Sequence, residues 1–292
     1  MHDRREFLAG VAVTLLAGCG HRQPQLDKLR TIEHAAQGRL GAYILDTESQ
    51  HGFGWRQDDR FAHCSSFKMS LAAMVLHLAD QGSADLAEVL HWSAADMLPI
   101  SPISEAHLEH GLSVEELAHA TLVTSDNTAA NVLLRRFGGP RALTAFWRSL
   151  GDNISQLDRY EPELNDVPAG QTWDSTTPKA MALTTAKLVQ GAALTAPSRS
   201  KLRMWMTEVQ TGAKRIRAGL PHDWISGDKT GTGIAKAKHT YVDLAFGGPI
   251  GRAPLIIIAY FEPARLVESM DPVALDVLAE VGRIAASSIG AA

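Results

Sequence analysis

The chain has 292 residues, of which 45% are hydrophobic, so it can bury a substantial core in one large domain or in two joined ones. Its formal net charge is −4 and its basic residues are scattered, which excludes the electropositive footprint of a nucleic-acid-binding protein. We therefore expect a small-molecule or peptide substrate and no nucleic-acid partner.

Residues 1–18 are predicted to be an export signal. Asp3-Arg4-Arg5-Glu6-Phe7-Leu8 is similar to a twin-arginine signal, and the apolar run 11–17 is too short to span a bilayer. Leu16-Ala17-Gly18-Cys19 resembles a bacterial lipobox, in which Cys19 carries lipid and becomes the mature N-terminus. The alternative is ordinary signal-peptidase cleavage that discards Cys19. Either interpretation predicts export from a bacterial cytoplasm to the periplasm or cell surface, with residues 19–24 as a tether.

The chain holds only two cysteines, Cys19 and Cys64. If Cys19 carries lipid, no intramolecular disulfide can form, and Cys64 should be a free, buried thiol. His63 beside it suggests a Cys/His pair, but a better supported nucleophile lies next door. The twelve histidines show no close His-x-His or His-Glu-x-x-His cluster, so neither a metal nor another cofactor is expected.

Hydrophobic periodicity predicts the elements in chain order. Residues 25–37 form an amphipathic helix, and residues 39–47 and 52–62 alternate apolar and polar positions as in a β-hairpin. A helix beginning near Ser65 and ending by Gly82 opens a long helical region. The further helices are expected at 113–123, 127–137, 140–150, 178–194 and 197–210, the late strands at 224–232, 241–247 and 255–261, and a closing helix at 271–289.

This order predicts a two-domain protein. Strands at both ends of the chain with helices between them imply an α/β domain made from residues 25–62 and 211–292, interrupted by an all-α domain at 63–210. Residues 152–177 lack periodicity, and so long a connection inside a compact domain is usually functional or an ordered Ω-loop, here at about 159–174. The cleft between two such domains is where we expect the site.

The first chemical motif is Ser65-x-x-Lys68 at the start of the buried helix. A serine hydroxyl is a weak nucleophile until a neighbouring group takes its proton, and a lysine one turn on can do so if burial or nearby positive charge lowers its pKa. The helix N-terminus also offers free N–H groups to an oxyanion. Alone, the motif fits equally an N-cap serine followed by a solvated lysine.

Three further motifs change that interpretation. Ser125-Asp126-Asn127 falls in a polar break between helices, Lys229-Thr230-Gly231-Thr232 lies on the first late strand, and the long loop contains Glu161-Pro162-Glu163-Leu164-Asn165. Singly they could be a helix cap, a strand end and loop charges. In this order and on these elements they resemble the serine β-lactamases of class A. That resemblance covers essentially the whole mature chain and implies the serine β-lactamase/D,D-peptidase-like fold, with an antiparallel sheet flanked by terminal helices and an inserted helical domain.

The resemblance implies a role for each reacting group. Ser65 would be the nucleophile, and either Lys68 or Glu161 acting through a water would remove its proton. Ser125 would pass the proton to the departing ring nitrogen. The remaining groups would be the backbone N–H groups of Ser65 and Thr232 as the oxyanion hole, and Glu161 with Asn165 as the holder of the deacylating water.

Substrate recognition is implied in the same way. The carboxylate of a penicillin or cephalosporin would be bound by Lys229, Thr230, Thr232 and Ser125, with Gly231 in the same strand. Arg215 matches an alternative arginine found in a subset of the family, and Asn127 would bind the acylamido side chain. Arg159 and Asp174 would pair across the neck of the Ω-loop, although they could be plain surface charges, and the Glu161-Pro162 bond would be cis rather than an ordinary trans bond.

The sequence departs from the family pattern at three places. Some carbapenem-hydrolysing relatives pair the cysteine before the nucleophile with a second cysteine, where this chain has Gly233. Arg215 and Thr232 still motivate carbapenem hydrolysis as a hypothesis. Ile100 replaces the aromatic residue that often flanks the site, so stacking on substrate should be lost there. The turn 236–241 also differs from the usual small-residue pattern.

Two rival functions remain. A penicillin-binding D,D-peptidase shares the serine, lysine and Lys-Thr-Gly chemistry but lacks the loop glutamate, so Glu161 with Asn165 argues against it. A lipid-anchored β-lactam receptor would need a transmembrane helix or cytoplasmic domain, and the sequence contains neither. We expect a monomeric enzyme that hydrolyses β-lactam antibiotics and meets the membrane only through a lipid on Cys19.

Overall fold

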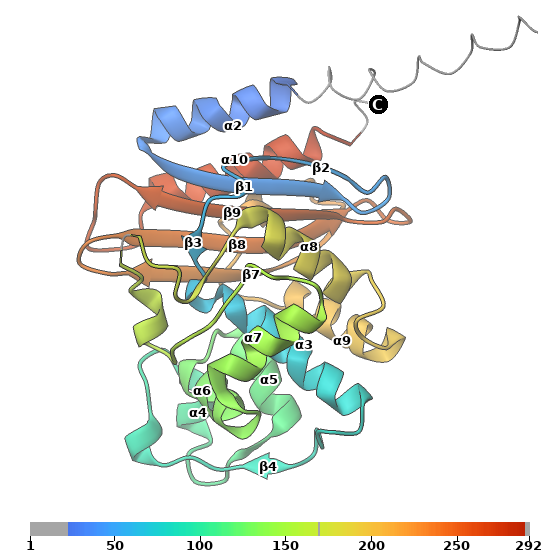
Figure 1. Ribbon diagram of the computed structural model, residues 1–292, viewed down its shortest axis with the longest axis vertical. Coiled ribbons are helices and arrows are strands. Elements are labelled where there is room, and N and C mark those ends of the chain that lie inside the picture. The colour runs from blue at the N-terminus through green and yellow to red at the C-terminus, as the bar shows by residue number, and fades with distance from the viewer. Residues whose placement is uncertain (1–22, 169, 290–292) are drawn as a thin grey trace, which may run out of the picture.

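The computed structural model describes residues 23–168 and 170–289 (Figure 1). Its framework is a five-stranded antiparallel sheet in the order β2-β1-β9-β8-β7, so that strands from the two ends of the chain lie side by side. The strands are β1 (Gly38–Asp46), β2 (His51–Trp55), β7 (Ile225–Ile234), β8 (His239–Gly248) and β9 (Leu255–Pro263). Two short pairs lie outside this sheet, β3 (Phe61–Ala62) with β6 (Ser175–Thr176) and β4 (Val89–Leu90) with β5 (Leu112–Ser113).

Alternation along β9 explains why both faces of the sheet are covered. Leu255, Ile257 and Phe261 project to one face, where they pack with α2 (Gln23–Ala36) and α10 (Pro272–Ala286). The residues between them, such as Ile256 and Ile258, join the larger core on the opposite face. Side chains alternate between faces with period two, so a strand buried on both sides is apolar throughout.

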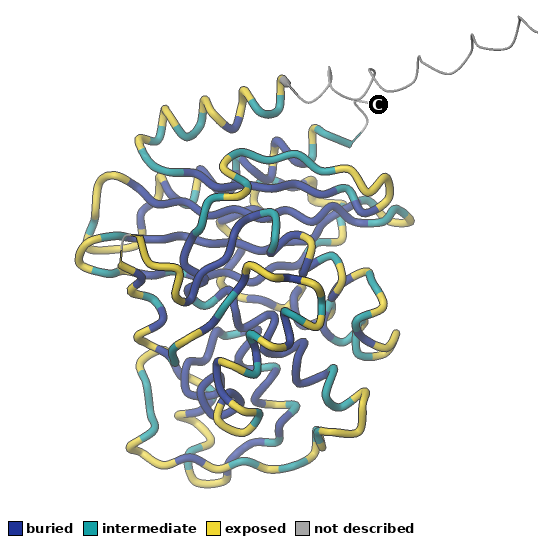
Figure 2. Tube along the Cα trace, viewed as in Figure 1, coloured by how far each residue is buried: buried dark blue, intermediate teal, exposed yellow. Residues whose placement is uncertain are grey.

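The helical region is built around α3 (Phe67–Asp80). Ten consecutive residues of α3, from Phe67 to Leu76, are buried, which fits its nearly continuous apolar sequence. Figure 2 shows most of this helix and the central strands of the sheet among the dark, buried parts of the trace, with exposed loops around them. The surrounding helices are α4 (Pro102–Ala106), α5 (Val114–Val123), α6 (Asn127–Arg136), α7 (Gly139–Ser149), α8 (Pro178–Val189) and α9 (Ala196–Thr207).

The helices α8 and α9 connect the two parts of the molecule. The sequence grouped them with the helical domain, at 63–210. In the structure α8 contacts β1 and β9, and α9 contacts β7. The inner face of the sheet and the helical region consequently share one continuous apolar core. The cleft walls are therefore fixed relative to each other by packing as well as by chain connections.

Most predicted elements are confirmed to within a few residues, but the prediction of one strand over 52–62 is wrong. Strand β2 ends at Trp55, and Arg56 has a left-handed backbone conformation with φ of 43°. A left-handed residue cannot continue a strand. The chain therefore turns and leaves the main sheet, and Phe61–Ala62 pair with β6 instead.

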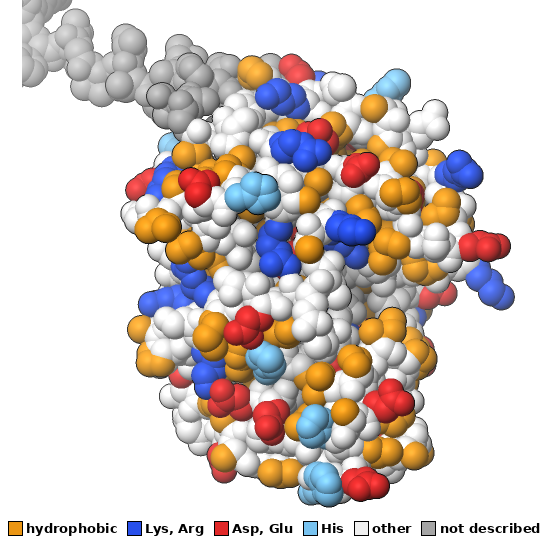
Figure 3. Space-filling model, turned by 180° about the vertical axis from the view of Figure 1, so that it is seen from behind, with side chains coloured by type: hydrophobic (Ala, Val, Ile, Leu, Met, Phe, Trp, Pro, Cys, Tyr) orange, Lys and Arg blue, Asp and Glu red, His pale blue; other side chains and the backbone are white. Residues whose placement is uncertain are grey.

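The predicted export signal and Cys19 lie outside the described residues. Over 23–168 and 170–289, no helix has the length and apolar character needed to cross a membrane. On the face shown in Figure 3, basic and acidic side chains are interspersed. This distribution agrees with the scattered charge in the sequence.

Candidate active site

Ser65 lies in a tight turn that faces the cleft. The turn is the 3₁₀ helix Cys64–Ser66, which runs directly into α3 and places Lys68 in the first turn of that helix. Cys64 has a left-handed backbone with φ of 45°, a conformation that non-glycine residues adopt at a cost and that often occurs at functional sites. Lys68 Nζ donates a hydrogen bond of 3.0 Å to Ser65 Oγ.

Lys68 is completely buried among acceptors. Its Nζ donates to the carbonyl oxygen of Ser125 at 2.8 Å and to Asn127 Oδ1, and it lies 3.1 Å from Glu161 Oε1. Burial lowers the pKa of Lys68, and the Glu161 carboxylate opposes that shift. An amine with a lowered pKa releases its proton more readily, which is the property required of a base beside a serine.

Ser125 lies between two buried lysines. It occupies the polar turn between α5 and α6, with a left-handed φ of 61°. Lys229 Nζ donates to Ser125 Oγ at 2.9 Å, and Lys68 Nζ lies 3.5 Å from the same atom. Burial lowers the pKa of Lys229 well below its usual value, and the positive charge of Lys68 adds to this shift. The Ser125 hydroxyl can therefore carry a proton between the two lysine amines and a ligand in the cleft.

Asp126 fixes this turn to its neighbours. As the N-cap of α6, it accepts a hydrogen bond from Ala129 N at 2.8 Å. It also accepts from Ile103 N and Ser104 N at 3.1 and 2.9 Å. The buried carboxylate thus ties α4 to α6 and holds Asn127 at the cleft.

The long loop brings a carboxylate to Ser65. Ser65 Oγ donates to Glu161 Oε1 at 3.1 Å, and Asn165 Nδ2 donates to the second carboxylate oxygen of Glu161 at 2.5 Å. The Glu161-Pro162 peptide bond is cis. Through Oε1 the carboxylate contacts both the Ser65 hydroxyl and Lys68 Nζ.

Sequence reasoning missed Asn131, which anchors Glu161 from α6. Asn131 Nδ2 donates to the Glu161 carbonyl at 2.8 Å, and the Glu161 amide donates to Asn131 Oδ1 at 3.0 Å. The sequence did offer one signal. Asn131 is four residues after Asn127, so the two side chains lie on the same face of the helix. A buried, doubly bonded amide holds the loop backbone in place.

Arg159 and Asp174 meet at the neck of this loop, away from the cleft. Arg159 Nε lies 2.6 Å from Asp174 Oδ2, and Asp174 Oδ1 also accepts from the amides of Asp158 and Arg159 at 2.7 and 2.9 Å. The aspartate is fully buried. Three hydrogen bonds to one carboxylate close the loop on itself.

Strand β7 forms the opposite side of the cleft. It is an edge strand of the sheet, so one row of its backbone amides is free of strand pairing and faces the turn Cys64–Ser66. A Cβ atom at Gly231 would lie 2.9 Å from the carbonyl oxygen of His63 and 3.0 Å from the amide of Ser66. Only glycine allows this close approach, which explains the Lys-Thr-Gly sequence.

Arg215 supports this strand from the segment before the 3₁₀ helix η4 (Ile216–Gly219). Its guanidinium donates to the carbonyl oxygens of Gly231 and Val242 at 2.8 and 2.7 Å, and to Thr232 Oγ1 at 2.6 Å. Only 3% of Arg215 is exposed, and it contributes to the lining of the cleft. It therefore places positive charge directly behind Thr232.

The predicted residues converge on one cleft of about 920 Å³. Lys68 and Lys229 are buried just beneath its surface, and Ile100, Ile234 and Met270 add exposed apolar side chains to its lining. The predicted residues that line it directly are Ser65, Ser125, Asn127, Glu161, Asn165, Arg215, Thr230, Gly231 and Thr232.

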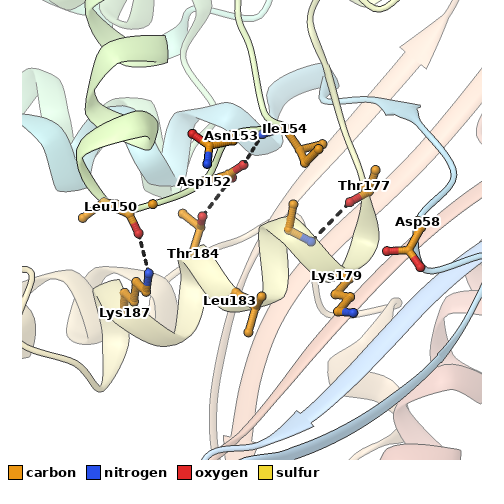
Figure 4. Close-up of a pocket in the computed structure, with 12 residues that line it drawn as sticks. Asp58, Leu150, Asp152, Asn153, Ile154, Thr177, Lys179, Leu183, Thr184 and Lys187 are labelled. Atoms are coloured by element: carbon orange, nitrogen blue, oxygen red, sulfur yellow. Dashed lines mark hydrogen bonds between the residues drawn. The ribbon is translucent and has the colours of Figure 1, made fainter.

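A second, smaller cavity of about 330 Å³ lies between α8 and the loop after α7 (Figure 4). Several of the residues that line it are joined in pairs by hydrogen bonds. Thr184 Oγ1 donates to Asp152 Oδ2 at 2.9 Å, and Lys187 donates to the carbonyl oxygen of Leu150. None of the predicted catalytic residues lines it, so its polar groups serve the packing of α8 against this loop.

His63 and Cys64 do not form a reactive pair. Both are fully buried, and burial raises the pKa of the Cys64 thiol and lowers that of His63 to about 3. The His63 ring stacks on Trp147 with ring centres 4.8 Å apart. Within the described residues, no group of three or more His, Cys, Asp or Glu side chains is arranged to hold a metal ion.

Comparisons with known proteins agree with this geometry. The model of the beta-lactamase enzyme family matches residues 25–289. The chain is 38% identical to beta-lactamase AST-1 of Nocardia asteroides, covering 99% of this chain and 96% of that one. It is also 38% identical to the carbapenem-hydrolyzing beta-lactamase KPC of Klebsiella oxytoca, covering 97% and 93%.

A solved structure gives the same answer. The class A beta-lactamase reconstructed as the last common ancestor of Gram-negative bacteria (GNCA4) superposes with a TM-score of 0.86 at 44% identity. The match covers 90% of this chain and 98% of that one. Matches of this extent, in sequence and in fold, show that the chain belongs to the class A serine β-lactamases and hydrolyses the β-lactam amide.

Proposed function

We propose that hydrolysis proceeds through an acyl-enzyme on Ser65, with Lys68, Ser125, Glu161 and Asn165 as the groups that move protons and hold water. One observation carries the proposal. Ser65 Oγ lies 3.0 Å from Lys68 Nζ and 3.1 Å from Glu161 Oε1, so two candidate bases contact one hydroxyl. This arrangement supports a serine nucleophile that is activated before substrate arrives.

Acylation forms one bond and breaks another. Ser65 Oγ attacks the carbonyl carbon of the β-lactam, and its proton passes to Lys68 or to Glu161. The amide N–H groups of Ser65 and Thr232 stabilise the resulting oxyanion. The ring C–N bond then breaks, and the nitrogen takes a proton from Ser125, which the two neighbouring lysines resupply.

Deacylation requires a water on the face of the ester that Glu161 occupies. Glu161 takes a proton from that water as its oxygen attacks the ester carbonyl, and the C–O bond to Ser65 breaks with return of a proton to Oγ. Asn165 donates to Glu161 and has a buried Oδ1 with no hydrogen-bond partner among the described residues. That acceptor can orient the attacking water.

Recognition rests on positive charge along β7. The carboxylate of a penicillin or cephalosporin would bind to Lys229, Thr230, Thr232 and Ser125, with Arg215 behind Thr232. Gly231 lets the strand approach the nucleophile, so the bound ring lies between the two sides of the cleft. Asn127 would donate to the acylamido group of the substrate.

Carbapenem hydrolysis is a second candidate, favoured by the 2.6 Å contact between Arg215 and Thr232 Oγ1. The relative named for carbapenem hydrolysis is 38% identical to this chain. Incubation with imipenem should then give continuous turnover. A long-lived adduct on Ser65 without turnover would contradict this extension.

We also propose that the enzyme is a monomer exported to the periplasm or cell surface and anchored by a lipid on Cys19. The lipobox-like sequence before Cys19 supports this location. Expression with labelled palmitate should label the wild-type chain and leave Cys19→Ala unlabelled and released from the membrane fraction. Equal labelling of both chains would contradict the anchor, and light scattering of the released enzyme would test the monomer.

The variant Glu161→Ala tests the proposed division of roles. It should still form the acyl-enzyme with benzylpenicillin but release product about 10³-fold more slowly, because no base activates the water. Intact-protein mass spectrometry should show a persistent adduct of one penicillin on Ser65. Multiple turnover at the wild-type rate in Glu161→Ala would contradict the proposed deacylation.

A further inference from the structure

The buried charge of Arg215 has no carboxylate in direct contact. Its terminal nitrogens donate only to two carbonyl oxygens and the Thr232 hydroxyl, and its Nε has no hydrogen-bond partner among the described residues. Burial lowers the pKa of Arg215, and Asp243 is the strongest of the nearby charges that oppose this shift. A cation that is buried away from water is stable there only if a nearby anion compensates its charge.

Asp243 lies in the middle of β8, directly across from Thr230 on β7, and is fully buried. Its Oδ2 accepts a hydrogen bond of 3.0 Å from the amide of Ile216, the residue that follows Arg215. Its Oδ1 has no hydrogen-bond partner among the described residues. Arg215 Nε and Asp243 Oδ1 are thus a buried donor and a buried acceptor that no described residue satisfies, and the two side chains interact through their charges rather than through a direct hydrogen bond.

We propose that Asp243 is the positioning residue for Arg215, and that it sets the affinity of the strand side of the cleft for the substrate carboxylate. The hydrogen bond to Ile216 fixes the backbone from which Arg215 extends. Burial and the charge of Asp228 raise the pKa of Asp243, and the Arg215 guanidinium opposes that shift and favours the ionised carboxylate. The negative charge in turn holds the guanidinium against Thr232 rather than letting it turn toward solvent. This inference rests on the proposed role of Arg215 in binding that carboxylate.

The test compares Asp243→Asn with Arg215→Ala in steady-state hydrolysis of benzylpenicillin. Asp243→Asn keeps the shape and an acceptor for Ile216 but removes the charge. Its KM should rise about 5- to 20-fold, with kcat within about threefold, because a hydrogen bond to a charged group is weakened at the binding step. In the Arg215→Ala background the same change should alter KM less than about twofold.

A second substrate separates positioning from a general structural role. Benzylpenicillin methyl ester lacks the carboxylate, so its KM should be the same for wild type and Asp243→Asn. Asp228→Asn is the comparison variant, because Asp228 is an equally buried strand carboxylate whose direct ion pair is with Arg217, at 3.1 Å, and whose charge acts on Arg215 less than that of Asp243 does. Its KM for benzylpenicillin should rise less than that of Asp243→Asn.

The outcomes are distinguishable. An unchanged KM in Asp243→Asn, or an equal rise with the ester or in the Arg215→Ala background, would overturn the inference. An unchanged KM in Arg215→Ala would overturn the proposed carboxylate role and this inference with it. If Asp243→Asn does not fold, Asp243→Ser supplies the same test, since a serine hydroxyl still offers an acceptor to Ile216 without charge.

Discussion

The two sides of the cleft are built differently. The helix side is formed by the turn Cys64–Ser66, α3, the α5–α6 turn and the long loop. Its polar residues are hydrogen-bonded to one another, namely Ser65, Lys68, Ser125 and Glu161. On the strand side, β7 offers backbone amides and hydroxyls, with the positive charges of Lys229 and Arg215 beneath them. The polar groups of the helix side surround the Ser65 hydroxyl, whereas the positive charges of the strand side are available to bind a ligand.

This difference between the two sides indicates which groups determine kcat and which determine the affinity for substrate. Groups that surround the reacting hydroxyl before substrate arrives act on the bonds that form and break, so their loss should reduce kcat. Groups that face the ligand's fixed negative charge bind substrate and transition state alike, so their loss should raise KM. Each variant below tests whether this division holds.

Ser65→Ala should have the largest effect. Without the hydroxyl no acyl-enzyme can form, and turnover of benzylpenicillin should fall by at least about 10⁴-fold. Mass spectrometry should find no covalent adduct, while the thermal unfolding temperature stays near that of wild type. A surviving adduct on another residue would show that the nucleophile is misassigned.

Lys229→Met should act mainly on binding, because Lys68 still lies 3.5 Å from Ser125 Oγ and can resupply its proton. It removes a buried cation but keeps most of the side-chain volume, and KM for benzylpenicillin should rise about 10- to 100-fold. In the wild type, the lowered pKa of Lys229 means that its charge is lost at a lower pH than for an ordinary lysine. KM should therefore climb on the alkaline side, and Lys229→Met should not show that rise. A loss of kcat with KM unchanged would contradict the assignment of the strand side to substrate binding.

His63→Phe tests the packing beneath the helix side rather than its chemistry. The pKa of His63 is about 3 in the folded enzyme against about 6.5 when unfolded, so only the unfolded state gains its proton as pH falls below 6.5. This linkage removes about 2 kcal/mol of stability between pH 7 and pH 5. Chemical denaturation of His63→Phe should show a pH dependence smaller by that amount, with kcat preserved. An unchanged pH dependence would contradict the neutral, buried ring.

Ile100→Tyr should have the smallest effect. Ile100 is 70% exposed at the mouth of the cleft, where an aromatic ring could stack on substrate. KM for benzylpenicillin should fall about two- to fivefold with kcat unchanged. Ile234→Tyr, at another exposed apolar position of the cleft lining, provides the comparison. An equal gain from both would indicate added apolar surface rather than stacking at one place.

The sequence predicted the helix side well because its signals are local. Ser65 and Lys68 lie one helical turn apart, and the Ser125 turn falls between two clear helices. Their meeting with Glu161 and Lys229 could not be worked out from spacing and was expected only from the family resemblance. The direct contacts around Ser65 Oγ are a result of the structure.

Residues that act through others were not predicted. Asn131 holds the Glu161 backbone. Its spacing from Asn127 indicates only that the two share a helix face, and it does not identify a partner 30 positions away. Asp243 stands in the apolar run Tyr241–Phe246, and a carboxylate in a buried strand was the signal that could have found it. The break after Trp55 was missed because Arg56, unlike glycine, gives no warning of a left-handed backbone.

The most direct measurement mixes the mature enzyme with excess benzylpenicillin and follows ring opening together with intact protein mass. Our account predicts continuous turnover with only a transient adduct on Ser65, because the Glu161 carboxylate is in place to activate water for deacylation. A single stoichiometric burst with a persistent adduct would contradict it and would favour the slow deacylation of a D,D-peptidase or a receptor.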